Sequence, residues 1–430
     1  MKGPHVIREF GRIYRGQGID SFAEVWLPPR SFDLLRDFVM EQASFGGEID
    51  QAFRYGMRKG QEYVQVRNYV GVIQLSDGTH LEVLPKLLRT GQEADVTYTR
   101  RVFLDMLRHL RDSPFIDLDQ AQLKAERFPI LEVFIRTYLQ ELDALIQRGL
   151  QRSYISNTSN ERFLKGKLEV VHQLHHNLLH PERFFVTYDD YSLNNPWQRL
   201  IKSTLLKLRQ QTRALPNQRM LQRLMFCLDD VPASGSIQSD WQALDFTDRQ
   251  YKPYHQLMRW SRVFLFDQSF TNFQGRQLNM ALLFPMERIF EDYVGHWLRK
   301  RLSGWAIESQ HHRHHLIEDF EGRRAFGLRP DFVLTHPDGR FIIADAKWKR
   351  LDAGKKHPPL GISQADLYQL YAYGHKYRLA DGSCPELWLL YPEQEALPLR
   401  RKLKYEEGLE IELIGVKLGE DTKNRPIQSV

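Results

Sequence analysis

Residues 329–347 read RPDFVLTHPDGRFIIADAK and contain two short runs of β-branched, aromatic and aliphatic residues. The runs, residues 332–335 and 341–346, are separated at 336–340 by His-Pro-Asp-Gly-Arg, whose Pro and Gly supply the backbone angles of a turn. Apolar runs on either side of such a turn predict two neighbouring antiparallel strands. We therefore expect a β-hairpin here.

The register of this hairpin decides where its charged residues lie. Thr335 is expected to pair with Phe341 across the five-residue turn. Counting four residues outward along each strand then places Asp331 opposite Asp345. Because side chains alternate with a period of two along a strand, Lys347 faces the same way as Asp345.

Two facing carboxylates suggest a metal site. At about 5 Å they repel each other unless a positive charge lies between them, and hard oxygen ligands suit Mg²⁺ or Mn²⁺. We assign Asp331 and Asp345 as metal ligands and Lys347 as the cation that positions the attacking water or offsets developing charge. An Asp-X-Lys motif alone usually marks an exposed strand end with solvated charges. The prediction of phosphodiester cleavage therefore depends on the hairpin around it.

A helix is predicted just upstream of the hairpin, from apolar residues at helical spacing. These residues are Met286, Ile289, Phe290, Tyr293, Val294 and Trp297. Glu287 and Glu291 fall along one edge of this apolar stripe. Either glutamate could reach the metal, although a single helix glutamate is more often a surface charge.

A second helix is predicted downstream, again from apolar spacing. Its stripe is formed by Leu367, Leu370, Tyr371, Gly374 and Tyr377. Gln369 and Tyr373 lie one helical turn apart on a different face. This pair could contact Lys347 or the DNA backbone.

The order of these motifs resembles the PD-(D/E)xK nuclease superfamily, in the variety with a Gln-X-X-X-Tyr helix shared with RecB-type nucleases. More narrowly, the chain resembles the McrC family, the nuclease subunits of McrBC modification-dependent restriction systems. Further resembling stretches cover most of the chain and read VGVI at 70–73, LEVLPK at 81–86, FLKGKL at 163–168, YDDYSLNNP at 188–196 and FPME at 284–287. The resemblance maps the acidic ligands and lysine onto Asp331, Asp345 and Lys347, and the helix glutamate onto Glu291.

The resemblance implies an α/β (α+β) fold in three parts. A C-terminal nuclease core of a mixed sheet flanked by helices, residues 276–430, would follow a β-rich and helical N-terminal domain, residues 1–155, that docks to the partner. A mostly helical linking region, residues 156–275, would lie between them. The polar run Ser156–Asn160 reads as the joint at which this region begins.

The resemblance also implies a partner, a hexameric AAA+ GTPase of the McrB type that recognises modified cytosine in double-stranded DNA. The N-terminal part would stimulate its GTP hydrolysis, and DNA translocation would trigger cutting. This chain has no phosphate-binding loop of its own, because Gly166-Lys167 lacks the earlier glycine and the following hydroxyl. GTP is therefore expected on the partner, and Mg²⁺ on this chain.

Composition is compatible with this interpretation. The 430 residues carry 60 basic and 54 acidic side chains, a net charge of +6 that suits a polyanionic partner without proving one. The two cysteines, Cys227 and Cys384, lack metal-ligand spacing, and the N-terminal residues do not form a signal peptide. No apolar stretch is long enough for a membrane span, so a cytoplasmic protein is expected.

Two other functions stay open, namely a self-sufficient Mg²⁺-dependent nuclease for DNA repair or processing, and a non-catalytic adaptor of a AAA+ ring. A zinc site at His311, His312, His314 and His315 is a weaker alternative, because adjacent residues of a strand point to opposite faces. Cleavage without a partner would favour the stand-alone nuclease. GTPase stimulation without cleavage would favour the adaptor.

Overall fold

The computed structural model divides the chain into two compact units, Met1–Phe128 with Ser269–Val430, and Pro129–Gln268. The structure describes residues 3–43, 52–89, 92–93, 95–111, 113–117, 129–266, 277–311, 314–318, 321, 323–352, 354–355, 359–378, 382–393, 400–405 and 408–419. The division into three parts with different roles stays a prediction, because a division into compact units does not show what each part does.

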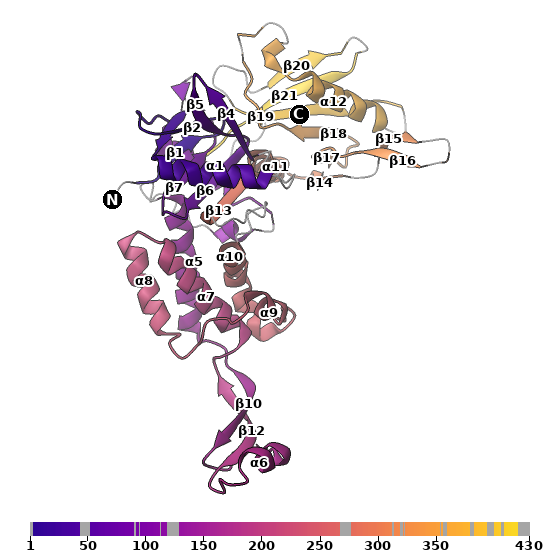
Figure 1. Ribbon diagram of the computed structural model, residues 1–430. Helices are drawn as coiled ribbons and strands as arrows, with labels where there is room; N and C mark the ends of the chain where they lie inside the picture. The colour runs from indigo at the N-terminus through magenta and orange to yellow at the C-terminus, as the bar shows by residue number, and fades with distance from the viewer. Residues whose placement is uncertain are drawn as a thin grey trace. The chain divides into compact units, whose positions relative to one another are not determined.

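The first unit begins with two four-stranded sheets (Figure 1). One sheet has the order β3-β2-β5-β4, with β2 (Arg12–Arg15), β3 (Glu24–Leu27), β4 (Phe53–Arg58) and β5 (Gln61–Val66). The other has the order β1-β7-β6-β13, with β1 (His5–Arg8), β6 (Tyr69–Leu75), β7 (His80–Leu84) and β13 (Leu278–Pro285). Because β13 pairs with β6 from about 200 residues away, it ties the N-terminal sheet to the C-terminal part of the chain.

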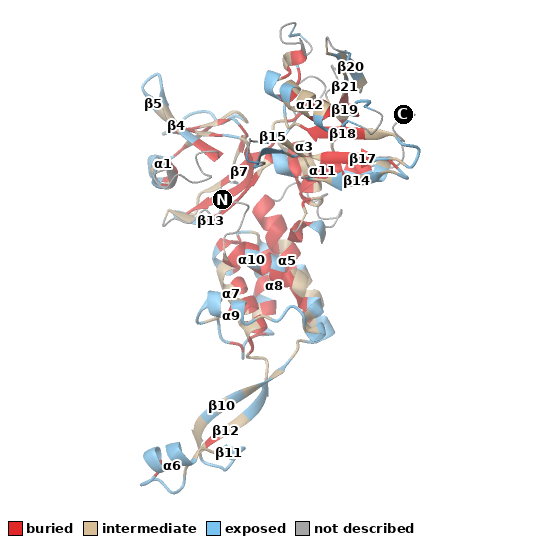
Figure 2. Ribbon diagram, turned by 90° about the vertical axis from the view of Figure 1, so that its right-hand side faces the viewer, coloured by how far each residue is buried: buried red, intermediate tan, exposed pale blue. Residues whose placement is uncertain are grey.

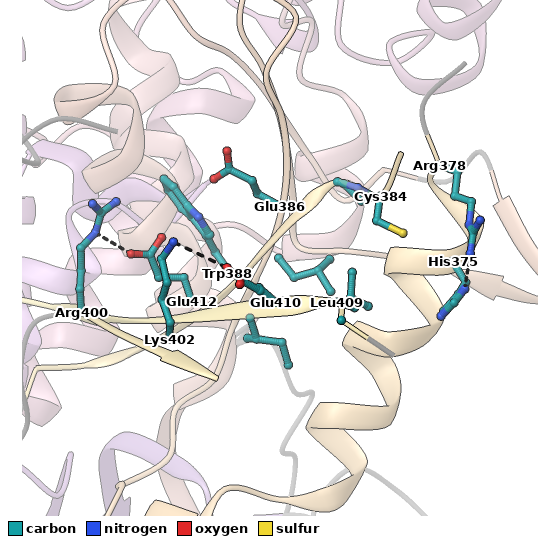
Figure 3. A pocket seen from close by; sticks show the side chains of 14 residues that line it. His375, Arg378, Cys384, Glu386, Trp388, Arg400, Lys402, Leu409, Glu410 and Glu412 are labelled. Carbon is teal, nitrogen blue, oxygen red and sulfur yellow. Dashed lines mark hydrogen bonds and ion pairs between the residues drawn. The ribbon is translucent and has the colours of Figure 1, made fainter. Parts of the chain in front are cut away.

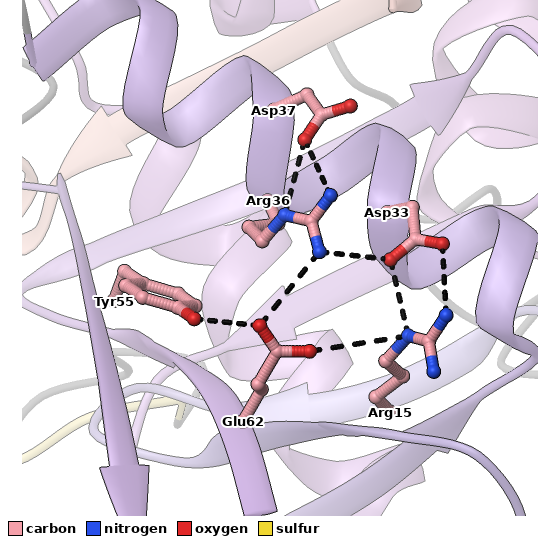
Figure 4. A network of polar contacts seen from close by, with 6 residues as sticks. All are labelled: Arg15, Asp33, Arg36, Asp37, Tyr55 and Glu62. Carbon is pink, nitrogen blue, oxygen red and sulfur yellow. Dashed lines mark hydrogen bonds and ion pairs between the residues drawn. The ribbon is translucent and has the colours of Figure 1, made fainter.

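Helix α1 (Pro29–Ala43) packs on the first of these sheets through an apolar core and a polar network. Figure 4 shows Arg15 reaching Asp33 of the helix at 3.1 Å, while Arg36 reaches Glu62 of β5 at 3.7 Å. The Tyr55 hydroxyl donates to Glu62 at 2.6 Å. These contacts join the helix to β2 and β5, and Tyr55 connects β4 to the same network.

A helical segment follows the N-terminal sheets. Its elements are the short strands β8 (Leu88–Arg89) and β9 (Gln92–Glu93), helix α3 (Val96–Leu107) and the 3-10 turn η1 (Pro114–Asp117). Asp95 caps α3 by accepting from the backbone N–H of Tyr98 at 2.8 Å, and Arg100 of α3 pairs with the buried Glu82 of β7 at 2.6 Å. The cap fixes the start of α3, and the ion pair attaches the helix to the N-terminal sheet.

The C-terminal part is built around a six-stranded mixed sheet of order β14-β17-β18-β19-β21-β20. Its strands are β14 (Ala306–Ser309), β17 (Phe332–Thr335), β18 (Phe341–Ala346), β19 (Glu386–Pro392), β20 (Arg400–Lys404) and β21 (Glu410–Val416). The three strands β18, β19 and β21 are parallel, and the others pair antiparallel. A separate ribbon consists of β15 (His314–Glu318) and β16 (Arg324–Leu328).

Helices α11 (Met286–Arg301) and α12 (Gln364–Lys376) pack against this sheet, and the 3-10 turn η3 (Pro359–Gly361) precedes α12. Buried residues of α12 form one core with apolar residues of β17, β18 and β19, among them Leu370, Ile343 and Leu389. A mixed sheet with helices on it, and hence the mixed α/β class expected from the sequence, is confirmed.

The second unit combines a helical bundle with a β-arm. The bundle contains α5 (Ile130–Arg148), α7 (Pro196–Gln211), α8 (Leu215–Phe226), α9 (Ile237–Gln242), η2 (Arg249–Tyr254) and α10 (His255–Leu265). Asn195 caps α7 by accepting from the backbone N–H of Gln198, and Pro196 occupies the first turn, which explains the Asn-Pro of the stretch 188–196. No described helix of either unit has the length and hydropathy of a membrane span.

The arm consists of β10 (Ser153–Glu161), β12 (Phe184–Ser192), the short β11 (Lys167–Leu168) and α6 (Val170–His176). Figure 2 shows it mostly at intermediate or exposed positions. The prediction of a polar joint at Ser156–Asn160 is wrong, because these residues lie inside β10 and pair with β12. A strand with polar residues on both faces lacks the apolar alternation by which strands are recognised.

Candidate active site

The hairpin register predicted from the sequence is confirmed. Thr335 pairs with Phe341, and the pairing continues to Phe332 opposite Ala344. Asp331 and Asp345 therefore come next to each other at the open end of the hairpin. The Oδ2 atom of Asp331 accepts from the backbone N–H of Ala346 at 2.8 Å, which holds this carboxylate against β18.

Asp345 is the more deeply buried of the two carboxylates, with 1% of its surface exposed. Its Oδ2 atom lies 2.5 Å from Nζ of Lys347, while within the described structure its Oδ1 atom has no hydrogen-bond partner. A buried carboxylate oxygen without a donor is costly unless a cation approaches it. The geometry therefore favours a cation beside Asp345.

Burial and like charge together disfavour ionisation of this pair. Burial, followed by the charges of Asp345 and Glu291, raises the pKa of Asp331 well above its usual range. Burial also raises the pKa of Asp345, although Lys347 opposes the shift. For Lys347, burial alone would lower the pKa, but Asp345 and Asp331 outweigh it and raise the pKa. One lysine thus faces two carboxylates, an excess of negative charge.

These residues fit a Mg²⁺ ion with few protein ligands. Among the residues that the structure describes, no three His, Cys, Asp or Glu side chains converge as a ready-made metal cage. Mg²⁺ does not require such a cage, because it keeps several waters and is usually bound by one or two carboxylates together with substrate phosphate. Asp331 and Asp345, with the unpartnered Oδ1, supply that ligand set.

Glu291 lies close enough to contribute but is held by other groups. Its Oε1 atom accepts from Nε2 of Gln310 at 2.7 Å and lies 3.6 Å from the guanidinium of Arg111. Burial raises the pKa of Glu291. Glu287 lines the same cavity one turn earlier on α11. Of the two, Glu291 is the one whose charge acts on Asp331.

Gln369 and Tyr373 contact each other on α12, with Nε2 of Gln369 donating to the tyrosine hydroxyl at 2.6 Å. Tyr373 is 1% exposed and belongs to the core between helix and sheet. Its pKa is raised by burial and then by the charge of Asp345. The tyrosine hydroxyl therefore belongs to the surroundings of the carboxylate pair, with Gln369 orienting it.

Three nearby charged groups escaped the sequence reasoning. Asp366, 4% exposed, is bound by Nζ of Lys349 at 2.8 Å, and its charge adds to the raised pKa of Asp345. The third is Arg111, whose Nε donates to Asp292 at 2.5 Å. Asp366 three residues before Gln369 was a usable signal, because helix residues three apart share a face. Arg111, 180 positions before Glu291, offered none.

A cavity of about 650 Å³ opens onto this cluster. Its lining includes Glu287, Glu291, Asp331, Lys347, Lys349 and Asp366, together with Arg111 and Arg288. The acidic residues of this lining suit a metal ion, and its basic residues suit a phosphate. All the sequence-predicted site residues except Asp345, Gln369 and Tyr373 line this cavity.

A larger cavity of about 850 Å³ lies elsewhere on the same unit, along β19, β20 and β21 (Figure 3). Its charges are largely paired, with Arg400 3.2 Å from Glu412 and Lys402 3.7 Å from Glu410. It contains none of the predicted site residues. Size alone therefore does not identify the site, and the cluster of buried carboxylates is the better guide.

The histidines considered as a zinc site serve other contacts. Nδ1 of His311 lies 3.0 Å from the Tyr377 hydroxyl, and the His314 ring packs edge-on against Tyr377. His312 is outside the described residues. No zinc-type ligand set occurs in the described part of the chain.

Comparison with known proteins gives one family. The family model described as McrBC 5-methylcytosine restriction system component matches residues 64–392. A chain of the refined half-complex from the tetradecameric assembly of Thermococcus gammatolerans McrB AAA+ hexamers with bound McrC is similar, with a TM-score of 0.70 and 16% identity, over 96% of this chain and 94% of that chain. A chain of the cryo-EM structure of the Thermococcus gammatolerans McrBC complex has a TM-score of 0.51 and 16% identity, over 70% of this chain and 88% of that chain. No curated protein gives a significant match. At these identities the structural likeness shows a shared fold.

Proposed function

Because the chain belongs to the McrBC family of 5-methylcytosine restriction system components, we propose that it is the Mg²⁺-dependent DNA endonuclease subunit of such a system. The observation that carries the proposal is the buried pair Asp331 and Asp345, with Lys347 beside it, next to a cavity that basic residues also line. A scaffold without chemistry would gain nothing from burying two carboxylates that repel each other.

The metal would be held by Asp331 and Asp345, with Mn²⁺ as an alternative to Mg²⁺. When bound, it would polarise the scissile phosphate and lower the pKa of a bound water. Lys347, already ion-paired with Asp345, is placed to orient that water and to offset negative charge as it develops. Tyr373, oriented by Gln369, lies close enough for the charge of Asp345 to raise its pKa.

Glu291 would complete the ligand set by changing its partners. In the structure Gln310 and Arg111 occupy its carboxylate. Its release toward the metal would free the guanidinium of Arg111 from Glu291, while Nε of Arg111 stays bound to Asp292. The ligand set would then be complete only after Glu291 has changed partners.

We also propose a hexameric AAA+ GTPase of the McrB type as the partner. Its basis is the family together with the similar fold of chains in complexes described as McrB hexamers with McrC. GTP would be bound and hydrolysed by the partner and stimulated by this chain, and the substrate would be double-stranded DNA carrying modified cytosine. Cleavage would then require both proteins.

The deciding experiment is cleavage of methylated and unmethylated plasmid in Mg²⁺, by this chain alone and with an McrB-type GTPase plus GTP. We compare the wild type with Asp345→Asn and with the control Asp338→Asn, whose carboxylate lies in the exposed turn of the same hairpin. Cleavage that needs partner, GTP and methylation, and is lost only in Asp345→Asn, would support the proposal.

The alternatives give different results in the same assay. Cleavage by the chain alone would indicate a self-sufficient nuclease. Unchanged cleavage in Asp345→Asn, or GTPase stimulation with no cleavage by the wild type, would indicate an adaptor whose hairpin takes no part in chemistry.

A further inference from the structure

Glu9, at the N-terminal end of the chain, contacts the segment that carries the candidate catalytic lysine. Its Oε1 atom accepts two hydrogen bonds, from the backbone N–H of Lys86 at 2.9 Å and from the indole Nε1–H of Trp348 at 2.8 Å. Trp348 directly follows Lys347 in the sequence. The contact therefore joins the N-terminal sheet to the candidate site across 339 positions.

The contact is made at some energetic cost. Glu9 is 1% exposed, and its Oε2 atom has no hydrogen-bond partner in the described part of the protein. Burial raises the pKa of Glu9 to about 7, although Lys86 and Trp348 favour the charged form. A buried carboxylate with one unpaired oxygen is destabilising on its own. Its presence here calls for a role besides packing.

The turn that presents Glu9 is also strained. Phe10, the next residue, has a φ of +61°, in the left-handed region that non-glycine residues rarely adopt, and its ring is 48% exposed. The backbone N–H of Glu9 donates to Leu84 at 2.8 Å, which fixes the start of this turn against β7. The conformation at Phe10 is costly, so the surrounding structure must hold this turn in place.

Trp348 lies between Glu9 and the helix that carries Glu291. Its ring packs against Phe290 of α11 with ring centroids 5.4 Å apart. The backbone N–H of the preceding Lys347 donates to Leu390 of β19 at 2.9 Å. A shift of the indole would therefore move the backbone of Lys347 and the position of Phe290, next to Glu291, together.

We propose that Glu9 is a positioning residue, which fixes the Trp348 indole and thereby sets Lys347 and Glu291 relative to the carboxylate pair. This inference rests on the proposed nuclease function, because it gives the N-terminal module a direct part in arranging the cleavage site. A change in the N-terminal sheet would reach Lys347 through this hydrogen bond and the Phe290 contact, in addition to the direct continuation of β13 into α11.

The test begins with a measurement that needs no activity. Hydrogen–deuterium exchange of the full chain is compared between wild type, Glu9→Leu, which fills the volume without an acceptor, and Glu9→Gln, which keeps an acceptor oxygen. We expect peptides covering residues 346–350 to exchange at least about threefold faster in Glu9→Leu and at the wild-type rate in Glu9→Gln. The control Glu82→Gln weakens another buried ion pair of the same unit and should leave these peptides unchanged.

The second measurement is single-turnover cleavage in the complete complex with partner and GTP. In Glu9→Leu and in Trp348→Phe, which removes the indole donor together with part of the ring, the rate constant should fall by about tenfold or more with unchanged DNA affinity, as for other groups that orient metal ligands. Glu9→Gln should restore the rate. The double variant Glu9→Leu/Trp348→Phe should be no slower than the slower single variant, because both changes remove one interaction.

Each result decides the matter. Faster exchange, slower cleavage and rescue by glutamine support the proposal. Unchanged exchange in Glu9→Leu, or faster exchange with wild-type cleavage, overturns it and leaves Glu9 a structural residue. Absence of cleavage in the wild-type complex would instead overturn the proposed nuclease function, while the exchange data still decide whether Glu9 holds the 347–348 segment.

Discussion

Two antiparallel strand pairs of this protein, β17–β18 and β10–β12, differ in almost every respect except the direction of pairing. The hairpin β17–β18 has four residue pairs and nearly all of its side chains are buried, whereas β10–β12 has nine pairs and side chains that are mostly intermediate or exposed. The shorter hairpin carries the candidate chemistry. Strand pairing alone therefore does not create a reactive site.

Burial makes the difference. In β17–β18, apolar neighbours deprive Asp345 of water, so that its charge must be compensated by Lys347 or by a metal ion. In β12, Asp189 and Asp190 are exposed and remain solvated. An aspartate becomes chemically useful only where burial in a core makes a neighbouring cation necessary.

The largest effect is expected from Asp345→Asn. Since even a partner of a metal ligand contributes about 10–100-fold, loss of a ligand should reduce DNA cleavage in the complete complex by more than about 100-fold. Single-turnover assays at saturating Mg²⁺ measure the loss of cleavage. Asp189→Asn, the same substitution in the exposed strand β12, serves as the matched control. Residual cleavage within tenfold of wild type would remove Asp345 from the chemistry.

The next largest effect is a difference in unfolding free energy between substitutions in β18 and in the arm. Ile343→Ala in β18, at 0% exposure, should cost about 2–5 kcal/mol of unfolding free energy because it leaves a cavity. Leu179→Ala in the turn of the arm, at 86% exposure, should change it by no more than about 0.5 kcal/mol. Urea denaturation of the chain alone gives both values. Similar costs for the two would mean that the arm is packed in solution.

Metal and pH should act on the buried carboxylates. The pKa values of Asp331 and Asp345 are raised in the folded protein, so the stability they contribute is present below their unfolded pKa near 4 and is lost as pH rises through the folded values. In EDTA, the unfolding temperature of wild type should therefore fall with rising pH relative to Asp331→Asn/Asp345→Asn.

Added Mg²⁺ should reverse that loss only in the wild type. At 100 times its dissociation constant, the ion would add about 2.7 kcal/mol. Thermal unfolding of both proteins between pH 4 and pH 8, with and without Mg²⁺, measures the two effects. Equal stabilisation of the double variant would show that the ion binds elsewhere.

The smallest effect on cleavage is expected from a substitution on α12. Tyr373→Phe removes the hydroxyl that Gln369 orients and should slow cleavage by about tenfold while leaving the fold intact. Tyr377→Phe, one turn further along α12, removes a hydroxyl that contacts His311 instead and serves as the control. An equal loss in both variants would assign Tyr373 to packing of the helix alone.

Much of the candidate site was predictable because its information is local. The pairing of Thr335 with Phe341 follows from turn length, and strand alternation then places Asp331 by Asp345. The same rules failed for β10, where polar residues on both faces hide the strand. Local patterns predict a strand correctly where one of its faces is apolar, and they fail where neither face is apolar.

The sequence by itself determined the hairpin, its register and the chemical character of the carboxylates with Lys347. Only the tertiary structure decided which distant groups surround them, namely Arg111, Gln310 and, through Trp348, Glu9. The reason is physical, because turn geometry and side-chain period act over a few residues. Contacts across hundreds of positions arise only when sheets and helices pack, and this packing buries the carboxylates and raises their pKa values.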